Sequence, residues 1–168
     1  QMKTSDVLDV AVVGTGYVGL VTGVCLAHVG HKVTCVDIDA DKVARMRRGE
    51  VPIYEPGLEP LFREVLEAGT VEITTDLKAA VAAADIVFLA LPTPQGADGA
   101  ADLSAVLTVA DQLGSMLNGF TVIVTKSTVP VGTGVQVAVR IQATATTECA
   151  VASNPVFLRE GLAVEDCL

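Results

Sequence analysis

The strongest fold signal in this chain is the stretch Val10-Ala-Val-Val-Gly14-Thr-Gly16-Tyr-Val-Gly19-Leu20. Its first four residues are apolar and predict a buried parallel strand, and the glycines that follow have the spacing Gly-x-Gly-x-x-Gly. Gly14 permits a tight turn, Gly16 lets the backbone approach a diphosphate, and Gly19 lets the next helix lie close to the sheet. That helix points its free amide groups and the positive end of its dipole at the diphosphate. The stretch therefore predicts a dinucleotide-binding βαβ unit.

A second apolar strand, Val33-Thr-Cys-Val-Asp37, ends in a carboxylate eighteen residues after Gly19. A carboxylate in this position accepts hydrogen bonds from both hydroxyls of a ribose, and it repels the 2′-phosphate of NADP. The glycine triplet alone also occurs at ordinary strand-to-helix turns, so a nucleotide-free βαβ unit is the structural alternative. The whole arrangement favours NAD as the cofactor over NADP.

Apolar runs and helical stripes alternate along the rest of the chain. The predicted strands are 10–13, 33–37, 71–75, 86–91, 120–125 and 150–153. The predicted helices after the first βαβ unit are 39–48, 58–68, 77–83, one that Asp102 or Ser104 caps and that runs to about 117, and 133–145. Asp76 is expected to cap the helix 77–83. This alternation predicts an α/β fold: a Rossmann-type doubly wound parallel sheet with helices on both faces and the strand order 3-2-1-4-5-6.

Composition limits the class of protein. The 168 residues are 51% hydrophobic with a mean hydropathy of +0.53, which fits one domain, 1–168, whose sheet is buried on both faces. The net charge of −9 disfavours nucleic acid or an anionic membrane as a partner, so a bound anion has to be held locally. No apolar run reaches the roughly 18 residues that span a bilayer, and residues 1–6 lack the apolar core of a secretory signal. We expect a cytoplasmic protein.

Four cysteines stand at positions 25, 35, 149 and 167, without any Cys-x-x-Cys spacing. Positions 25 and 35 fall within a predicted helix and a predicted strand. We therefore expect buried small hydrophobic side chains rather than metal ligands or disulfides, and no metal site.

Three further segments follow the fourth, fifth and sixth predicted strands: Pro92-Thr93-Pro94, 126–133 and 154–161. Ligands of open α/β sheets bind at the carboxyl edge of the strands, where these segments lie. The hydroxyls of Thr93, Ser127 and Thr128 are candidates to bind the cofactor or a water beside the nicotinamide. The alternative is that each bonds its own backbone within a turn.

Five stretches together resemble the nucleotide-sugar dehydrogenase family, in the family's order and spacing. They are Gly14-Thr-Gly-Tyr-Val-Gly-Leu20, Pro52-Ile-Tyr-Glu-Pro-Gly-Leu58, Leu91-Pro-Thr-Pro94, Lys126-Ser-Thr-Val-Pro-Val-Gly-Thr133 and Asn154-Pro-Val-Phe-Leu-Arg-Glu-Gly161. The resemblance covers nearly the whole chain. It is closest to the members that oxidise UDP-glucose, with GDP-mannose or another nucleotide sugar as the alternative substrate. It implies an oxidoreductase that converts C6 of a UDP-sugar to a carboxylate with two NAD and one water.

The resemblance also implies roles for individual residues. Asp37 corresponds to the residue that binds the adenosine ribose, and Lys42 lies near the same end of the cofactor. The implied cofactor-binding set is Gly14, Gly16, Tyr17, Val18, Gly19, Asp37, Lys42, Pro92, Thr93, Ser127, Thr128 and Glu160. The implied substrate-binding set is Phe157, Leu158, Arg159 and Glu160. Of these residues, Thr128 and Glu160 are the catalytic candidates.

Two departures from the family bear on activity. Val156 stands where the family has a glutamate thought to act as acid or base, a role that contributes about 10² to 10⁴ in rate. The family continues into a C-terminal domain that supplies the nucleophilic cysteine and most UDP contacts, and none of the four cysteines here matches that nucleophile. We therefore expect the chain to bind NAD without turnover. A non-catalytic NAD-binding or assembly module, docking a homo-oligomer or the missing domain through Val156, Phe157 and Leu158, is the alternative.

Overall fold

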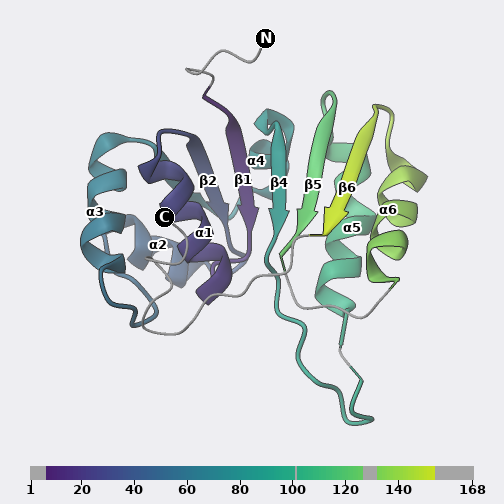
Figure 1. Ribbon diagram of the computed structural model, residues 1–168, viewed down its shortest axis with the longest axis horizontal. Helices are drawn as coiled ribbons and strands as arrows, with labels where there is room; N and C mark the ends of the chain where they lie inside the picture. The colour runs from purple at the N-terminus through teal and green to yellow at the C-terminus, as the bar shows by residue number, and fades with distance from the viewer. Residues whose placement is uncertain (1–6, 101, 127–131, 154–168) are drawn as a thin grey trace.

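The computed structural model describes residues 7–100, 102–126 and 132–153. They form a parallel sheet of six strands in the order β3-β2-β1-β4-β5-β6, which confirms the predicted order (Figure 1). The strands are β1 (Asp9–Val13), β2 (Lys32–Val36), β3 (Val71–Thr74), β4 (Ile86–Leu89), β5 (Thr121–Thr125) and β6 (Cys149–Ser153). The helices are α1 (Tyr17–His28), α2 (Ala40–Arg47), α3 (Leu58–Ala68), α4 (Leu77–Ala83), α5 (Ser104–Met116) and α6 (Thr133–Thr144).

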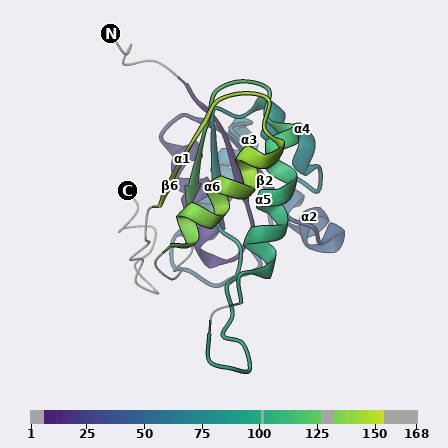
Figure 2. The same ribbon diagram turned by 90° about the vertical axis from the view of Figure 1, so that its right-hand side faces the viewer.

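The helices divide between the two faces of the sheet by their place in the chain. α1 and α3 pack on one face of β1, β2 and β3, while α4, α5 and α6 pack on the opposite face (Figures 1 and 2). The buried side chains of α2 belong to the same hydrophobic cluster as those of α1 and α3. Right-handed crossovers produce this division, because the chain leaves β3 at one edge and returns to pair β4 with the other side of β1. β1 and β4 therefore meet at the switch point where open α/β sheets bind their ligands.

Two hydrophobic clusters, one on each face, hold the layers together. Their largest fully buried members are Phe62, Leu20, Met46 and Leu58 on the α1 side. On the α5 side they are Leu89, Leu113, Ile123 and Ile141. Side chains alternate along each strand, so successive residues of β1 enter different clusters, and this strand is buried from both sides.

Aspartate side chains mark the start of two helices. Asp39 accepts hydrogen bonds from the amides of Asp41 and Lys42 at the start of α2. Asp76 accepts one from the amide of Ala79 at the start of α4, as predicted. Each carboxylate satisfies amide groups that have no partner within the helix, and its charge favours the positive end of the helix dipole.

The start of α5 differs from the prediction. The helix begins at Ser104 itself, its N-cap residue is Leu103, and no side chain caps it. The Asp102 carboxylate accepts the amide of Ser104 at 2.9 Å instead. An aspartate whose carboxylate accepts the amide two residues ahead forms an Asx turn. Asp102 therefore stabilises a turn before the helix and does not cap the helix.

β4 is covered less completely than its uninterrupted apolar sequence predicts. Val87 and Leu89 are fully buried beneath α4, α5 and α6, but Ile86 and Phe88 on the opposite side are only half-buried. The helices of that opposite side lie over β1, β2 and β3. The Lys126 ammonium lies 5.7 Å from the centre of the Phe88 ring, within the range of a cation–π contact.

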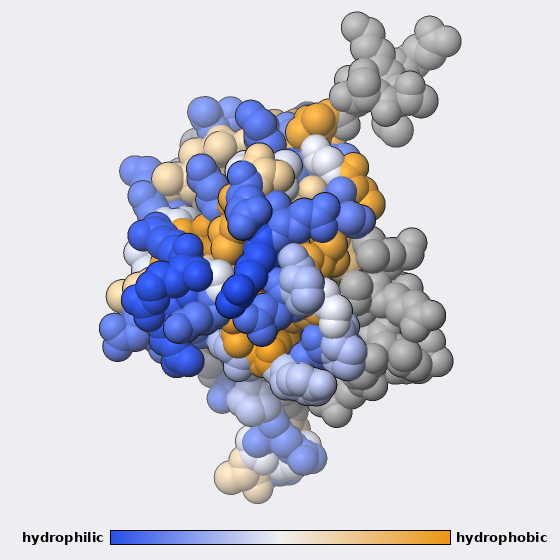
Figure 3. All heavy atoms as spheres, turned by 90° about the vertical axis from the view of Figure 1, so that its left-hand side faces the viewer, coloured by the Kyte–Doolittle hydropathy of each residue, from blue (hydrophilic) through white to orange (hydrophobic). Residues whose placement is uncertain are grey.

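The outer face formed by α2 and α3 is largely hydrophilic (Figure 3). Exposed ion pairs join Arg45 to Glu50 at 3.1 Å and Arg63 to Glu59 at 2.9 Å. Exposed pairs of this kind contribute little to stability, so the hydrophobic stripe beneath them holds these helices in place. None of the helices in the described part combines the length and apolar character that crossing a bilayer requires.

Candidate cofactor site

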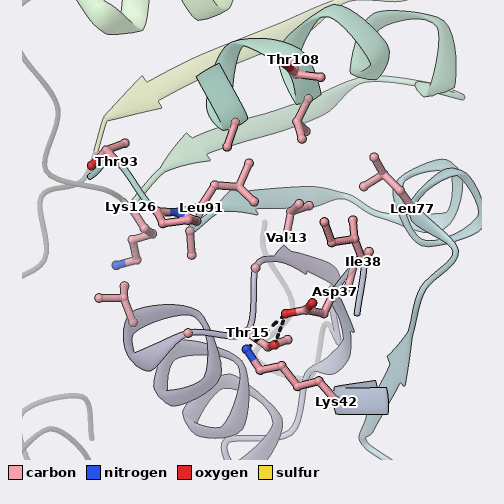
Figure 4. A pocket seen from close by; sticks show the side chains of 18 of the residues that line it. Val13, Thr15, Asp37, Ile38, Lys42, Leu77, Leu91, Thr93, Thr108 and Lys126 are labelled. Atoms are coloured by element: carbon pink, nitrogen blue, oxygen red, sulfur yellow. Dashed lines mark hydrogen bonds and ion pairs between the residues drawn. The ribbon is translucent and has the colours of Figure 1, made fainter. Parts of the chain in front are cut away.

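A pocket of about 930 Å³ opens at the carboxyl ends of β1, β2 and β4 (Figure 4). Its size falls within the range of about 300 to 1,000 Å³ typical of small-molecule and cofactor sites. Eight of the predicted cofactor residues line it: Gly14, Gly16, Tyr17, Val18, Asp37, Lys42, Pro92 and Thr93. The structure thus gathers the glycine turn, the end of β2 and the segment after β4 around one space.

The three glycines of the turn serve different purposes. Gly14 has a φ of +103°, and a Cβ there would lie 2.6 Å from the carbonyl oxygen of Ala90. Gly19 does not line the pocket; a Cβ at that position would lie 2.0 Å from the carbonyl oxygen of Gly14, so α1 packs tightly against the turn there. Gly16 lines the pocket, and a Cβ there would meet nothing within 4 Å. The first and third glycines allow close packing, and the second leaves the backbone open to a ligand.

α1 begins beside this open space. Gly16 is its N-cap residue, no side chain caps the helix, and its first turn contains no acidic residue. The amides of a first helical turn have no partner within the helix, and the helix dipole places partial positive charge there. An uncapped helix start that lines a pocket is suited to bind the diphosphate of a dinucleotide.

Asp37 lies one residue past the end of β2 and is approached by three donors. Its Oδ2 accepts a short hydrogen bond from the Thr15 hydroxyl and pairs with the Lys42 ammonium at 3.3 Å, and its Oδ1 accepts the Asp39 amide at 2.9 Å (Figure 4). Partial burial alone would raise the pKa of this carboxyl group. The hydrogen bonds from Thr15 and Asp39 and the charge of Lys42 outweigh burial, so the pKa lies below its ordinary value. Asp37 is therefore ionised at neutral pH.

The opposite wall comes from β4, β5 and α5. Leu91 and Thr93 follow β4, Lys126 follows β5, and Thr108 lies on the face of α5 that borders the pocket (Figure 4). The charged residues among the described lining are Asp37, Lys42 and Lys126, so the lining has one net positive charge in a chain of net charge −9. This local excess is what an acidic protein needs in order to bind an anionic cofactor.

Several lining residues were not predicted from the sequence. Thr15 is 1% exposed and donates its hydroxyl to Asp37. Tyr17 was predicted, but its partner was not: its hydroxyl donates to the buried carboxylate of Glu55 at 3.0 Å, which joins the start of α1 to the loop before α3. Ile38, Leu77 and the α5 residues lie where packing brings distant segments together. No signal in the sequence points to Thr15, because its hydroxyl meets Asp37 only once β1 and β2 pair.

The remaining predicted residues lie outside the described part of the chain. They are Ser127, Thr128, Val156, Phe157, Leu158, Arg159 and Glu160. Their cofactor, substrate and catalytic roles stay predictions. Cys167 lies outside it as well.

The cysteines at positions 25 and 35 are buried, as predicted, and Cys149 is half-buried. Burial raises the pKa of Cys35 to about 12, which keeps its thiol protonated and unreactive. Within the described ranges, no three His, Cys, Asp or Glu side chains lie together as metal ligands. The buried thiols therefore belong to the hydrophobic packing.

The pocket residues fit a dinucleotide. The turn is open at Gly16 toward an uncapped helix start, and an ionised carboxylate stands at the end of the neighbouring strand. These are the two features that bind a diphosphate and an adenosine ribose, respectively. Both were expected from the glycine stretch and the acid after β2.

Known proteins share this sequence and this fold. The profile of the UDP-glucose/GDP-mannose dehydrogenase family, NAD binding domain, matches residues 8–168. The UDP-glucose 6-dehydrogenase of Rhizobium meliloti is 50% identical over 161 residues, and that of Pseudomonas aeruginosa is 51% identical over 164 residues. Each alignment covers 95% of this chain but only 37% and 36% of the relative, so the chain spans little more than a third of their length.

Two solved structures have the same fold. A UDP-glucose dehydrogenase from the archaeon Pyrobaculum islandicum superimposes with a TM-score of 0.93 at 40% identity, over 99% of this chain and 40% of the other. A ternary complex of GDP-mannose dehydrogenase from Pseudomonas aeruginosa superimposes with a TM-score of 0.90 at 34% identity, over 95% of this chain and 38% of the other. The fold of this chain thus has solved examples.

Proposed function

Because the chain belongs to the UDP-glucose/GDP-mannose dehydrogenase family, as its NAD-binding domain, we propose that it forms the NAD site of an enzyme that oxidises a UDP-sugar. The sequence identities to UDP-glucose 6-dehydrogenases favour UDP-glucose as the substrate. Its C6 hydroxyl group would be converted to the carboxylate of UDP-glucuronate. The observation that supports this proposal most directly is the uncapped start of α1 beside the ionised Asp37 in one pocket.

The diphosphate of the cofactor is assigned to the first turn of α1. Tyr17 and Val18, the two residues that follow Gly16 in the helix, line the pocket there. A side chain at position 16 would occupy the same space, which explains the need for glycine. Lys126, on the opposite wall, adds positive charge and favours an anionic ligand over a neutral one.

The adenosine ribose is assigned to Asp37 and Lys42. An ionised carboxylate accepts hydrogen bonds from both ribose hydroxyls, and the same negative charge disfavours a phosphate on the 2′ position. The Asp37 carboxylate thus favours NAD over NADP. Pro92 and Thr93 line the pocket after β4 and are assigned to the other half of the cofactor, together with Ser127, Thr128 and Glu160. When bound, NAD accepts the hydride that leaves the sugar carbon.

We expect no turnover from this chain by itself. The family's acid–base glutamate is replaced by Val156, and a valine side chain cannot exchange a proton. We further propose that residues 1–168 form one domain, and that the nucleophilic cysteine and most UDP contacts belong to the part of the relatives that the alignments leave uncovered. We assign residues 157–160 to binding of the sugar nucleotide in the same enzyme.

Isothermal titration calorimetry of the chain with NAD and with NADP tests the proposal. NAD is expected to bind, and NADP to bind more weakly because its 2′-phosphate meets Asp37. A parallel assay with UDP-glucose, following NADH absorbance, is expected to show no turnover. A chain that binds neither dinucleotide at millimolar concentration would refute the assignment.

A further inference from the structure

We propose that Thr15 is a positioning residue for the cofactor, which acts by fixing the Asp37 carboxylate in the orientation that binds the adenosine ribose. The inference rests on the proposed NAD site and adds a residue that neither the glycine spacing nor the family resemblance assigns. Thr15 stands between the first two glycines of the turn, 22 residues before its partner.

The contact between Thr15 and Asp37 joins two separate parts of the site. Thr15 belongs to the turn after β1, whereas Asp37 follows β2, and the two side chains point toward each other across the pocket floor (Figure 4). Thr15 is only 1% exposed, and the Asp37 side chain is 14% exposed. A buried hydroxyl that donates to a charged acceptor makes a stronger hydrogen bond than one between neutral groups.

The Asp37 carboxylate has too few acceptor positions for all of its present donors and a bound ribose, and this limit indicates that Thr15 remains its partner when the ribose binds. A carboxylate has about four lone-pair positions, and the donors from Thr15, Asp39 and Lys42 use three of them. A ribose that donates both of its hydroxyls needs two, so one present donor has to leave. Asp39 donates from its backbone and Thr15 is buried, whereas Lys42 has a flexible side chain that is 29% exposed. Lys42 is therefore the donor that moves, and Thr15 stays.

The charged group that faces Asp37 is Lys42, which approaches from α2, while the turn after β1 contributes the neutral hydroxyl of Thr15. Once Lys42 moves, the Thr15 hydroxyl and the Asp39 amide are the donors that still orient the carboxylate. A threonine in this position thus defines which oxygen atoms face the pocket. Valine has the same shape without the hydroxyl and removes this contact alone.

The test compares the binding of ADP and 2′-deoxy-ADP, together with NAD, to wild type and to Thr15→Val. Wild type is expected to bind ADP more tightly than 2′-deoxy-ADP, because Asp37 accepts the 2′-hydroxyl. In Thr15→Val the affinities for NAD and ADP are expected to fall about tenfold, as for the loss of a hydrogen bond to a charged group. The affinity for 2′-deoxy-ADP is expected to fall less, so the preference for the 2′-hydroxyl shrinks.

Two variants serve as controls. Thr15→Ser keeps the hydroxyl and is expected to restore most of the preference for ADP. Thr22→Val removes the hydroxyl of another buried threonine, on α1 and away from the pocket, and is expected to leave all three affinities unchanged. A role of Thr15 in stability alone would change the melting temperature without changing the ratio of the ADP and 2′-deoxy-ADP affinities.

The outcomes separate this inference from the proposed function. If wild type does not bind NAD, the proposed function is wrong and the inference fails with it. If wild type binds NAD and folded Thr15→Val keeps the full preference for ADP, the inference alone is overturned. Should Thr15→Val not fold, Thr15→Ala replaces it. Should neither fold, the wild-type NMR spectrum decides: a slowly exchanging Thr15 hydroxyl proton supports the contact, and its absence overturns it.

Discussion

At Asp37, three donors meet one carboxylate: Thr15 comes from the turn after β1, and Asp39 and Lys42 come from the start of α2. The position of this acid after an apolar strand could be predicted from the sequence, because a buried strand followed by aspartate is a local pattern. Its partners could not be predicted, since the hydroxyl of Thr15 reaches it only through the pairing of β1 with β2. Local patterns thus identified the candidate carboxylate, and the tertiary fold determined its environment.

Replacing Asp37 by asparagine tests the role of its charge in cofactor choice. In Asp37→Asn, NAD affinity is expected to fall, because an amide offers one acceptor oxygen to the two ribose hydroxyls. NADP is expected to lose less affinity or to gain, because the negative charge that opposes its 2′-phosphate is gone. Titration calorimetry with both cofactors measures the ratio. An unchanged ratio would show that Asp37 lies away from the 2′ position.

The same carboxylate gives stability a defined dependence on pH. The folded-state pKa of Asp37 lies below its ordinary value, so the unfolded chain binds the proton more readily. Its contribution is therefore present above the unfolded pKa of about 3.9 and is lost as pH falls through the folded pKa. Urea unfolding of wild type and Asp37→Asn is expected to show a stability difference at neutral pH that shrinks below about pH 4. A difference that grows on acidification would contradict this.

Among the secondary-structure elements, α3 and α4 have the bounds that the sequence predicted, and the others differ by one or two residues at their ends. Apolar spacing and Gly69, with a φ of +75°, account for the bounds of α3. The start of α5 was missed because Asp102 and Ser104 form a turn with each other, and a cap and a turn use the same residue types. The half-buried side of β4 was missed because strand sequence alone does not tell which helices lie above it.

The glycines of the first turn allow a matched pair of substitutions. Gly19→Ala is expected to destabilise the fold by more than about 2 kcal/mol, because its Cβ would overlap the carbonyl oxygen of Gly14 and push α1 away from the sheet. Gly16→Ala is expected to leave stability near that of wild type, since a Cβ there meets nothing within 4 Å and its φ is −72°.

In NAD binding, Gly16→Ala is the variant that we expect to show the direct effect. Gly16→Ala places a methyl group in the space assigned to the diphosphate, so NAD affinity is expected to fall while the fold persists. Thermal unfolding and NAD titration of both proteins measure the two effects separately. If Gly16→Ala bound NAD as wild type does, the diphosphate would have to lie elsewhere.

For the molecule as a whole, the order of the strands could be predicted because the alternation of strands and helices allows few right-handed topologies. The volume of the pocket and the participation of Thr108 on α5 could not, because they depend on how two layers pack. The residues assigned to the sugar nucleotide, 157–160, were named from a motif and lie outside the described part.

Binding of NAD should stabilise the folded chain in proportion to the logarithm of its concentration. A ligand at a hundred times its dissociation constant adds about 2.7 kcal/mol to the free energy of unfolding. The melting temperature of the isolated chain is therefore expected to rise steadily with added NAD and much less with equal NADP. A melting temperature independent of NAD would show that the pocket does not bind it in the folded state.

The contact between Gly14 and Ala90 limits how the two halves of the sheet can move. An added Cβ at Gly14 would lie 2.6 Å from the Ala90 carbonyl oxygen, so the turn after β1 and the end of β4 already touch through their backbones. Ala90 also donates its amide to Val13 at 2.9 Å, which fastens the same junction. The backbone at the base of the pocket is therefore too closely packed to act as a hinge. We expect any opening and closing around a ligand to occur at its rim, by rotation of side chains such as Lys42, rather than by separation of the strands.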